Sequence, residues 1–192
     1  MLHRIFIAIN FPENIKTELL NLQKKWPTLP CHWIGKENMH LTLAFLGNVS
    51  DEELNVVFNI AREIVEKNKQ FSIYFVKSAY GPGTRPPPRL VWIEGKKSKE
   101  LSKLKEDLDT LLSQRINFQP EKREFLPHIT LGRVNTWNWK RIEPEERPDV
   151  TVETSFEIPV NSIEVMESHL KKTGAEYEIL KSFSLKEMAI KI

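Results

Sequence analysis

Two four-residue segments of the chain, His40-Leu41-Thr42-Leu43 and His128-Ile129-Thr130-Leu131, share the pattern histidine, aliphatic residue, threonine, leucine. Each segment lies at the end of a strand–helix–strand pattern, and the opening strand precedes each histidine by a similar distance. Ile5 lies 35 residues before the first histidine and Val91 lies 37 residues before the second. Halves that agree in element order and in spacing indicate an internal duplication.

The hydrophobic pattern of the first half predicts alternating strands and helices. The apolar run at 4–9 is typical of a buried strand, and a helix is expected between Pro12 and Pro27, where apolar residues recur at helical spacing. The other elements expected in this half are strands at 31–35, 40–46 and 71–80, and a helix from the capping box at 50–53 to about residue 65.

A Gly- and Pro-rich segment at 81–88 is the clearest break in the chain, and the order of elements repeats after it. The elements expected there are strands at 90–93, 128–134, about 155–168 and 176–185, a helix from Ser98 to 112, and a loop or short helix at 135–150. We therefore predict a two-lobed α+β fold, in which pseudo-twofold duplicated β-α-β units place antiparallel sheets around a central cleft. A parallel doubly wound sheet would also fit, but no Gly-rich phosphate loop follows the first strand.

Length and composition are those of an ordinary globular chain. Its 192 residues are 40% hydrophobic and 28% charged, which suits one domain spanning 1–192. The net charge of +2 neither supports nor excludes a nucleic-acid partner, because a neutral total can hide a basic cleft. The single cysteine, Cys31, fits a reducing compartment and is expected to be a half-buried strand residue rather than a nucleophile. No apolar run reaches the length of a membrane span, and we expect a cytoplasmic monomer.

The paired motifs carry the chemistry. On a strand, His40 and Thr42 point to one face while the two leucines point to the other, and the same holds for His128 and Thr130. One such motif is a weak signal, since a half-exposed strand explains it equally well. Two copies at matching places in a duplicated fold are expected to meet at a single cleft.

Two imidazoles on either side of a phosphate can divide the proton transfers of an in-line displacement. The neutral ring takes a proton from the attacking oxygen and the charged ring gives one to the leaving oxygen. Threonine hydroxyls can donate hydrogen bonds to the non-bridging oxygens. Two histidines without further ligands make a poor zinc site, so neither a metal nor another cofactor is expected.

These residues resemble the 2H phosphoesterase superfamily, and within it the bacterial and archaeal 2′-5′ RNA ligase family, also described as RNA 2′,3′-cyclic phosphodiesterases. The resemblance covers nearly the whole chain. It rests first on the two motifs and on the residues beside them, which are Trp33, 37–39 and 45–47 for the first motif and 127 and 132–133 for the second. It also rests on the strand at 4–9, on the segment 88–92, and on residues 167–168 and 177–178 near the end of the chain. It implies the LigT-like fold and an RNA end with a 2′,3′-cyclic phosphate as substrate.

The resemblance also implies residue roles. His40 would donate a proton to the leaving 3′ oxygen, and His128 would act as the base that activates water and leaves a 2′-phosphomonoester. Thr42 and Thr130 would bind the phosphate, and Arg133 would add a cation near it. Ala44 departs from the family pattern, in which lysine is frequent, and the residues before the Pro-rich loop depart from the usual Phe-Pro.

Other interpretations stay open. The reverse reaction, in which a cyclic phosphate end joins a 5′-hydroxyl, is permitted by microscopic reversibility. A non-catalytic nucleotide- or RNA-binding module is the alternative from a different class. Trp137 and Trp139, with the basic residues 140 and 141, could stack on RNA bases or simply pack, and Arg85 and Arg89 could touch RNA phosphate. No motif surrounds the three remaining histidines, at positions 3, 32 and 169.

Overall fold

The computed structural model describes residues 1–83, 86–172 and 174–187. Its strands are β1 (Leu2–Asn10), β2 (Cys31–Trp33), β3 (His40–Ser50), β4 (Phe71–Gly81), β5 (Leu90–Gly95), β6 (His128–Val134), β7 (Val152–Val160), β8 (Ser162–Lys171) and β9 (Gly174–Ser184). Its helices are α1 (Glu13–Gln23), α2 (Asp51–Lys67), α3 (Lys99–Arg115) and α4 (Thr136–Lys140), with short 3₁₀ turns at Lys36–Asn38 and Pro144–Glu146.

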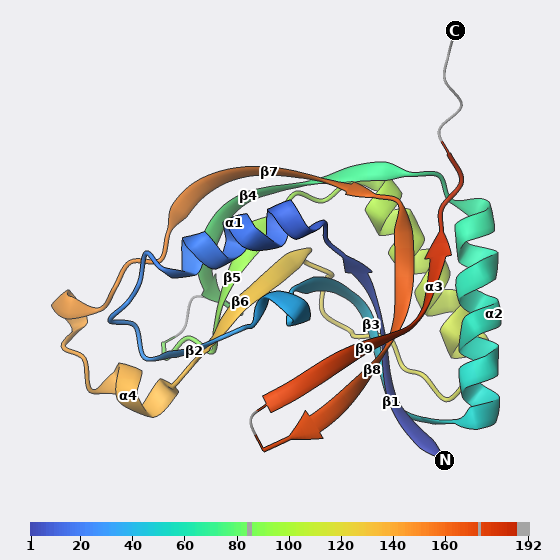
Figure 1. Ribbon diagram of the computed structural model, residues 1–192, viewed down its shortest axis with the longest axis horizontal. Helices are drawn as coiled ribbons and strands as arrows, with labels where there is room; N and C mark the ends of the chain where they lie inside the picture. Colours follow the sequence, from blue (N-terminus) through green and yellow to red (C-terminus); the bar gives the residue numbers. More distant parts are fainter. Residues whose placement is uncertain (84–85, 173, 188–192) are drawn as a thin grey trace, which may run out of the picture.

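The strands form two antiparallel sheets, and this confirms the predicted fold class (Figure 1). The first sheet has the order β3-β1-β8-β9 and the second the order β2-β6-β5-β4-β7. In the first sheet β1 pairs with β3, and in the second β5 pairs with β6, so each motif strand lies beside the strand that opens its own half. The parallel doubly wound alternative is therefore wrong.

The helices of the two halves pack across the molecule. Helix α1 belongs to the first half but lies against the second sheet, where the side-chain amide of Gln23 donates to the backbone oxygens of Ile34 and Leu131 at 2.9 and 3.0 Å. Helix α3 belongs to the second half and contacts β3 of the first sheet, next to α2 (Figure 1). This exchange joins the two lobes, because neither sheet is covered by its own helix alone.

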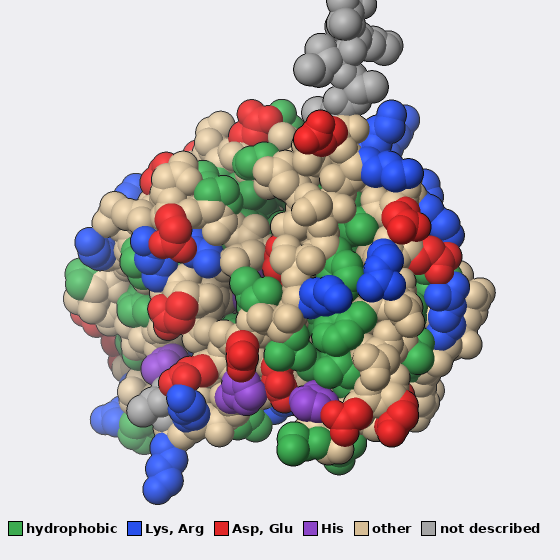
Figure 2. Space-filling view, turned by 45° about the vertical axis from the view of Figure 1, so that its right-hand side comes forward, with side chains coloured by type: hydrophobic (Ala, Val, Ile, Leu, Met, Phe, Trp, Pro, Cys, Tyr) green, Lys and Arg blue, Asp and Glu red, His purple; other side chains and the backbone are tan. Residues whose placement is uncertain are grey.

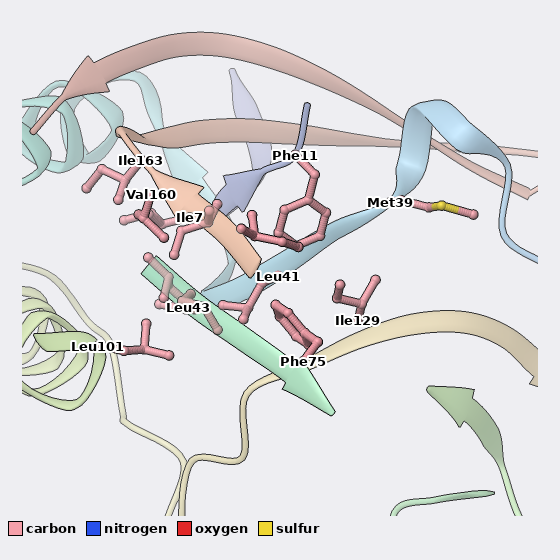
Figure 3. Close-up of a cluster of buried hydrophobic side chains, with 14 of the residues drawn as sticks. Ile7, Phe11, Met39, Leu41, Leu43, Phe75, Leu101, Ile129, Val160 and Ile163 are labelled. Atoms are coloured by element: carbon pink, nitrogen blue, oxygen red, sulfur yellow. The ribbon is translucent and has the colours of Figure 1, made fainter. Parts of the chain in front are cut away.

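One hydrophobic core serves both lobes. Leu41 and Ile129, which follow the two histidines in the chain, are fully buried in it. Figure 3 shows side chains from strands of both sheets, among them Ile7 and Phe75, converging on this cluster. The aliphatic residues of the motifs therefore anchor the strands, while the histidines and threonines on the opposite face remain half-buried.

The prediction of a single strand at 155–168 is wrong. The structure has two strands there: β7 pairs with β4 in the second sheet and β8 pairs with β1 in the first, with the change of sheet at Asn161. Buried apolar residues occur on both sides of this point, at Ile158 and Val160 in β7 and at Ile163 and Val165 in β8, so the apolar pattern does not mark the boundary. Helix α1 also ends at Gln23, earlier than expected, although Trp26 beyond it is buried.

Two features of the surface bear on partners. On the face shown in Figure 2, basic and acidic side chains are interspersed rather than gathered into a continuous basic field. No helix in the described part of the chain is long and apolar enough to cross a bilayer.

Candidate active site

The two histidines have the same backbone setting. His40 is the first residue of β3 and His128 the first residue of β6. In each ring Nδ1 donates to the carbonyl two residues earlier, Asn38 in one case and Leu126 in the other, both at 2.8 Å. A carbonyl oxygen only accepts, so Nδ1 carries the proton in the neutral ring and Nε2 is the atom left for chemistry.

A β-bulge follows each motif at the same position. In the second sheet Thr130 pairs with Trp92 and Gly132 with Val91, which leaves Leu131 as the extra residue. In the first sheet Thr42 pairs with Ala8 and Ala44 with Ile7, which leaves Leu43. The two half-sites thus share their register through this bulge, although β3 has a second irregularity, at Leu46, that the pairing of β5 with β6 lacks.

The bulges decide which side chains enter the cleft. Strict alternation would turn Arg133 away from His128, because five residues separate them. Past the bulge Arg133 pairs with Leu90, which lies on the same face as Trp92, so Arg133 shares the face of His128. By the same shift Phe45 shares the face of His40. One half-site therefore presents an arginine where the other presents a phenylalanine.

His40 is enclosed by aromatic side chains. Phe6 and Tyr177 lie with ring centroids 5.0 and 5.2 Å from its imidazole, and the Thr42 hydroxyl is 3.0 Å from its Nε2. The pKa of His40 is lowered to about 4, chiefly by burial; the bond to the Asn38 carbonyl opposes this change, and the charges of Lys16 and His128 add to it. His40 is therefore neutral at pH 7 in the unliganded protein.

His128 rests on one indole. The Trp92 ring lies 4.6 Å from the imidazole, centroid to centroid, and is 5% exposed. Its Nε1 donates to Glu94 at 3.3 Å, and Glu94 also pairs with Lys77 at 3.3 Å. Gly81 leaves room for the indole, because a Cβ there would come within 2.3 Å of the ring.

The motif strands face one cavity. β3 and β6 contact each other across the two sheets, and a cavity of about 820 Å³ is lined by Thr42, Phe45, Trp92 and His128 together with the segment 118–126. The Thr130 hydroxyl and the Arg133 guanidinium have no hydrogen bond or ion pair with any other described side chain. Of the five predicted site residues, the cavity brings together Thr42 of the first motif and His128 of the second, whereas His40, Thr130 and Arg133 are not among its lining residues.

A family profile for LigT like phosphoesterases matches the chain twice, over residues 9–92 and 93–177. The chain belongs to this family.

Named relatives agree with this membership. A protein of Methanocaldococcus jannaschii named RNA 2′,3′-cyclic phosphodiesterase is 31% identical over 94% of this chain and 99% of its own length. A Thermotoga maritima protein of the same name is 32% identical over 92% of each chain. Among solved structures, TT0787 of Thermus thermophilus gives a TM-score of 0.81 at 25% identity, covering 97% of this chain and all of that one. The complex of Escherichia coli LigT with 3′-AMP gives 0.77 at 24% identity, over 96% and 99% of the two chains.

Several other residues of this LigT-like phosphoesterase fall outside the cleft. Trp139 is 5% exposed and packs between Tyr80 and Arg147, so it is a core residue, whereas Trp137 is 66% exposed with Arg141 4.5 Å above its ring. Burial raises the pKa of the Cys31 thiol to about 12, which leaves it unsuited to nucleophilic catalysis. Arg89 is exposed, and Arg85 lies outside the described residues.

Sequence reasoning missed the neighbours that support the histidines. Lys16 and Glu94 have no motif of their own. Phe6 and Trp92 were used only as parts of family-like strands, and Gly81 only as part of the Gly- and Pro-rich segment. The signal that could have found Glu94 and Trp92 is the antiparallel register of β5 with β6, which places them opposite His128 and Thr130. Within the described residues no group of His, Cys, Asp and Glu side chains is arranged to hold a metal ion.

Proposed function

We propose that this chain hydrolyses the 2′,3′-cyclic phosphate at an RNA end to a 2′-phosphomonoester, without a metal or other cofactor. The observation that carries the proposal is the pair of matched His-x-Thr half-sites on two contacting strands, each of which contributes one residue, Thr42 or His128, to the lining of one cavity. The names of the relatives from Methanocaldococcus jannaschii and Thermotoga maritima support the substrate class.

The proposed reaction uses both rings. His128 Nε2 takes a proton from a water molecule as its oxygen bonds to phosphorus. The bond from phosphorus to the 3′ oxygen breaks in line with this attack, and His40 gives that oxygen its proton. Thr42 and Thr130 donate to the non-bridging oxygens, and Arg133 balances their negative charge. One water is consumed. His128 ends with the proton taken from the water and His40 without its own, so the rings return to their starting states when His128 releases a proton to solvent and His40 takes one up.

The acid role of His40 depends on the substrate. Burial keeps this ring neutral at pH 7 in the free protein. A phosphate anion beside Nε2 favours the imidazolium, since an opposite charge within a few ångströms raises the pKa of a histidine. His40 is therefore proposed to gain its proton as the cyclic phosphate binds. The opposite assignment, with neutral His40 as the base, is the competing mechanism that this low pKa favours.

Trp92 is proposed to position His128. The indole fixes the tilt of the imidazole, and its π face stabilises the positive charge that the ring acquires when it accepts a proton. Glu94 in turn accepts a hydrogen bond from the indole nitrogen.

The two lobes are proposed to act as one domain over 1–192, in a cytoplasmic monomer.

The deciding experiment is mass spectrometry of a short RNA ending in a 2′,3′-cyclic phosphate, incubated with the protein in EDTA. Hydrolysis adds the mass of one water, and resistance of the product to a 3′-specific phosphatase identifies the 2′-phosphomonoester. Adding an RNA with a 5′-hydroxyl tests the reverse, joining reaction by the appearance of a longer strand. An unchanged RNA that nevertheless binds would mean a binding module, and strict dependence on added zinc or manganese would refute the metal-free mechanism.

A further inference from the structure

His40 is shielded from the cavity that its partner ring lines. Thr42, whose hydroxyl lies 3.0 Å from His40 Nε2, and His128 line this cavity, but His40 itself does not. The ring is covered instead by Phe6 and Tyr177. Phe6 is fixed by the sheet, because β1 pairs with β3 on one side and with β8 on the other. How far His40 is covered therefore depends on what holds Tyr177.

Tyr177 lies on a two-stranded ribbon that extends beyond the sheet. β8 pairs with β1 only as far as Glu167. Past that residue β8 and β9 continue to pair with each other, and the ribbon consists of residues 168–171 and 174–177. Figure 1 shows this end of the hairpin projecting past the other strands of its sheet. Within the described chain no third strand pairs with the ribbon, so the pairing of the sheet does not hold Tyr177 over His40.

One side chain joins the ribbon to the first motif. The side-chain amide of Asn38 donates to the Ala175 carbonyl at 2.8 Å. No other hydrogen bond joins a described residue of the ribbon to the chain outside β8 and β9. The backbone carbonyl of the same Asn38 accepts from His40 Nδ1 at 2.8 Å. A single residue therefore holds both the ring and the ribbon that covers it.

The second half-site lacks this connection. Leu126 supplies the carbonyl that accepts from His128 Nδ1, as Asn38 does for His40, but a leucine side chain carries no hydrogen-bond donor. His128 lines the cavity, whereas His40 is covered. The difference between the open ring and the covered ring thus accompanies the presence of one amide.

We propose that Asn38 is a positioning residue of the first half-site, whose side-chain amide holds β9 across His40 and so determines how far this ring is covered. The inference rests on the proposed function only in giving His40 a part in the reaction. It implies that the two half-sites are made unequal by a contact outside the repeated motifs.

Asn38 is expected to act through burial rather than through charge. The titratable groups that face His40 from neighbouring elements are Lys16 of α1, His128 of β6 and Tyr177 of β9, and Lys16 is in turn faced by Glu13, Lys36, Glu37 and Glu164. Replacing the neutral amide of Asn38 leaves all of these groups in place. Burial lowers the pKa of His40, so a loosened ribbon that lets water reach the ring should raise it.

The test follows the titration of His40 by NMR in Asn38→Leu, which keeps the size of the side chain and removes the donor. Oδ1 of Asn38 is buried without a hydrogen-bond partner among the described residues, so the leucine loses no bond there. The pKa of His40 should rise from about 4 towards its ordinary value of about 6.5. The backbone amides of the ribbon should also exchange with solvent faster. Tyr177→Ala removes the cover directly and should raise the pKa of His40 at least as far.

A double-variant cycle separates this route from general loosening of the fold. Because Asn38 acts through Tyr177, the Asn38→Leu/Tyr177→Ala variant should titrate like Tyr177→Ala alone rather than show the sum of two shifts. Asn55→Leu is the matched control, since its exposed amide donates to a backbone carbonyl of α2 at 3.0 Å, outside the first half-site. It should leave the titration of His40 unchanged.

Three results would overturn the proposal: an unchanged titration of His40 in Asn38→Leu, fully additive shifts in the double variant, or an equal shift in Asn55→Leu. These measurements need no turnover, so failure to hydrolyse the cyclic phosphate would count against the proposed function alone. In the active enzyme the acid limb of kcat/KM should move to higher pH in Asn38→Leu, together with the pKa of His40.

Discussion

The two half-sites share a backbone and differ in their surroundings. Both histidines begin a strand, both donate Nδ1–H to the carbonyl two residues earlier, and both are followed by a bulge after the threonine. Across the ladder, however, His40 faces Asn10 and His128 faces Glu94. The duplicated frame sets the positions of the two imidazoles, and the neighbours make the two rings chemically unequal.

The aromatic neighbours show the same difference. His40 sits between Phe6 and Tyr177, which help to bury it, whereas His128 lies on Trp92, whose nitrogen is tied to a carboxylate. Burial disfavours the imidazolium of His40. This inequality is what a reaction with one acid and one base requires, and the predictions below test it.

Removing either ring should have the largest effect. His40→Ala and His128→Ala should each lower kcat about 10²- to 10⁴-fold, the usual value of a positioned proton-transfer group. A substrate with a nitrophenolate leaving group needs little protonation of the departing oxygen. It should therefore restore the activity of His40→Ala much more than the activity of His128→Ala. Restoration of both variants equally, or of His128→Ala alone, would reverse the assignment of acid and base.

The threonines should matter less than the rings they accompany. Thr42→Val and Thr130→Val keep the shape of the side chain and remove one donor to a charged oxygen, worth about 1.5–3 kcal/mol, or about 10- to 100-fold in kcat/KM. If both half-sites grip the same phosphate, each variant should also weaken inhibition by inorganic phosphate. An effect confined to one threonine would show that only one half-site touches it.

Much of this site could be predicted from the sequence, because the repeated motif fixes the strand, the buried face and the pairing of the halves. The side on which Arg133 lies could not be derived from spacing. Alternation alone turns it away from the cleft, and only the unpaired Leu131 returns it. The role of Gly81 was hidden for a similar reason, since its neighbour Trp92 is adjacent only through the pairing of β4 with β5. The boundary at Asn161 was missed because buried apolar residues recur on both sides of it, from Ile158 to Val165.

Gly81→Ala tests the support of the second half-site with a smaller expected effect. The added methyl would overlap the indole of Trp92, and overpacking of this kind costs about 1–3 kcal/mol of stability. Displacing the indole should lower kcat about tenfold with little change in KM, measured on a cyclic mononucleotide. The double variant Gly81→Ala/Trp92→Phe makes room for the methyl and should regain stability. A single variant with unchanged kcat would contradict the positioning role of Trp92.

Lys16→Met should have the smallest effect and tests the first half-site. Lys16 is 5% exposed on the inward side of α1, and burial lowers its own pKa. Its charge is one of the influences that lower the pKa of His40, so its removal should raise that pKa from about 4, followed by NMR titration of the ring. In kcat/KM, which reports the free enzyme, the acid limb near pH 4 should move to higher pH in the variant. The pH profile of kcat reports the enzyme with substrate bound. In that profile the same limb should lie at a higher pH even in the unmodified enzyme, because the bound phosphate anion favours the imidazolium of His40.

The control is Lys24→Met, which replaces an exposed lysine at the C-terminal end of the same helix and should leave the titration of His40 unchanged. A His40 that titrates alike in both variants would mean that burial alone sets its protonation, and that Lys16 has no part in distinguishing the two rings.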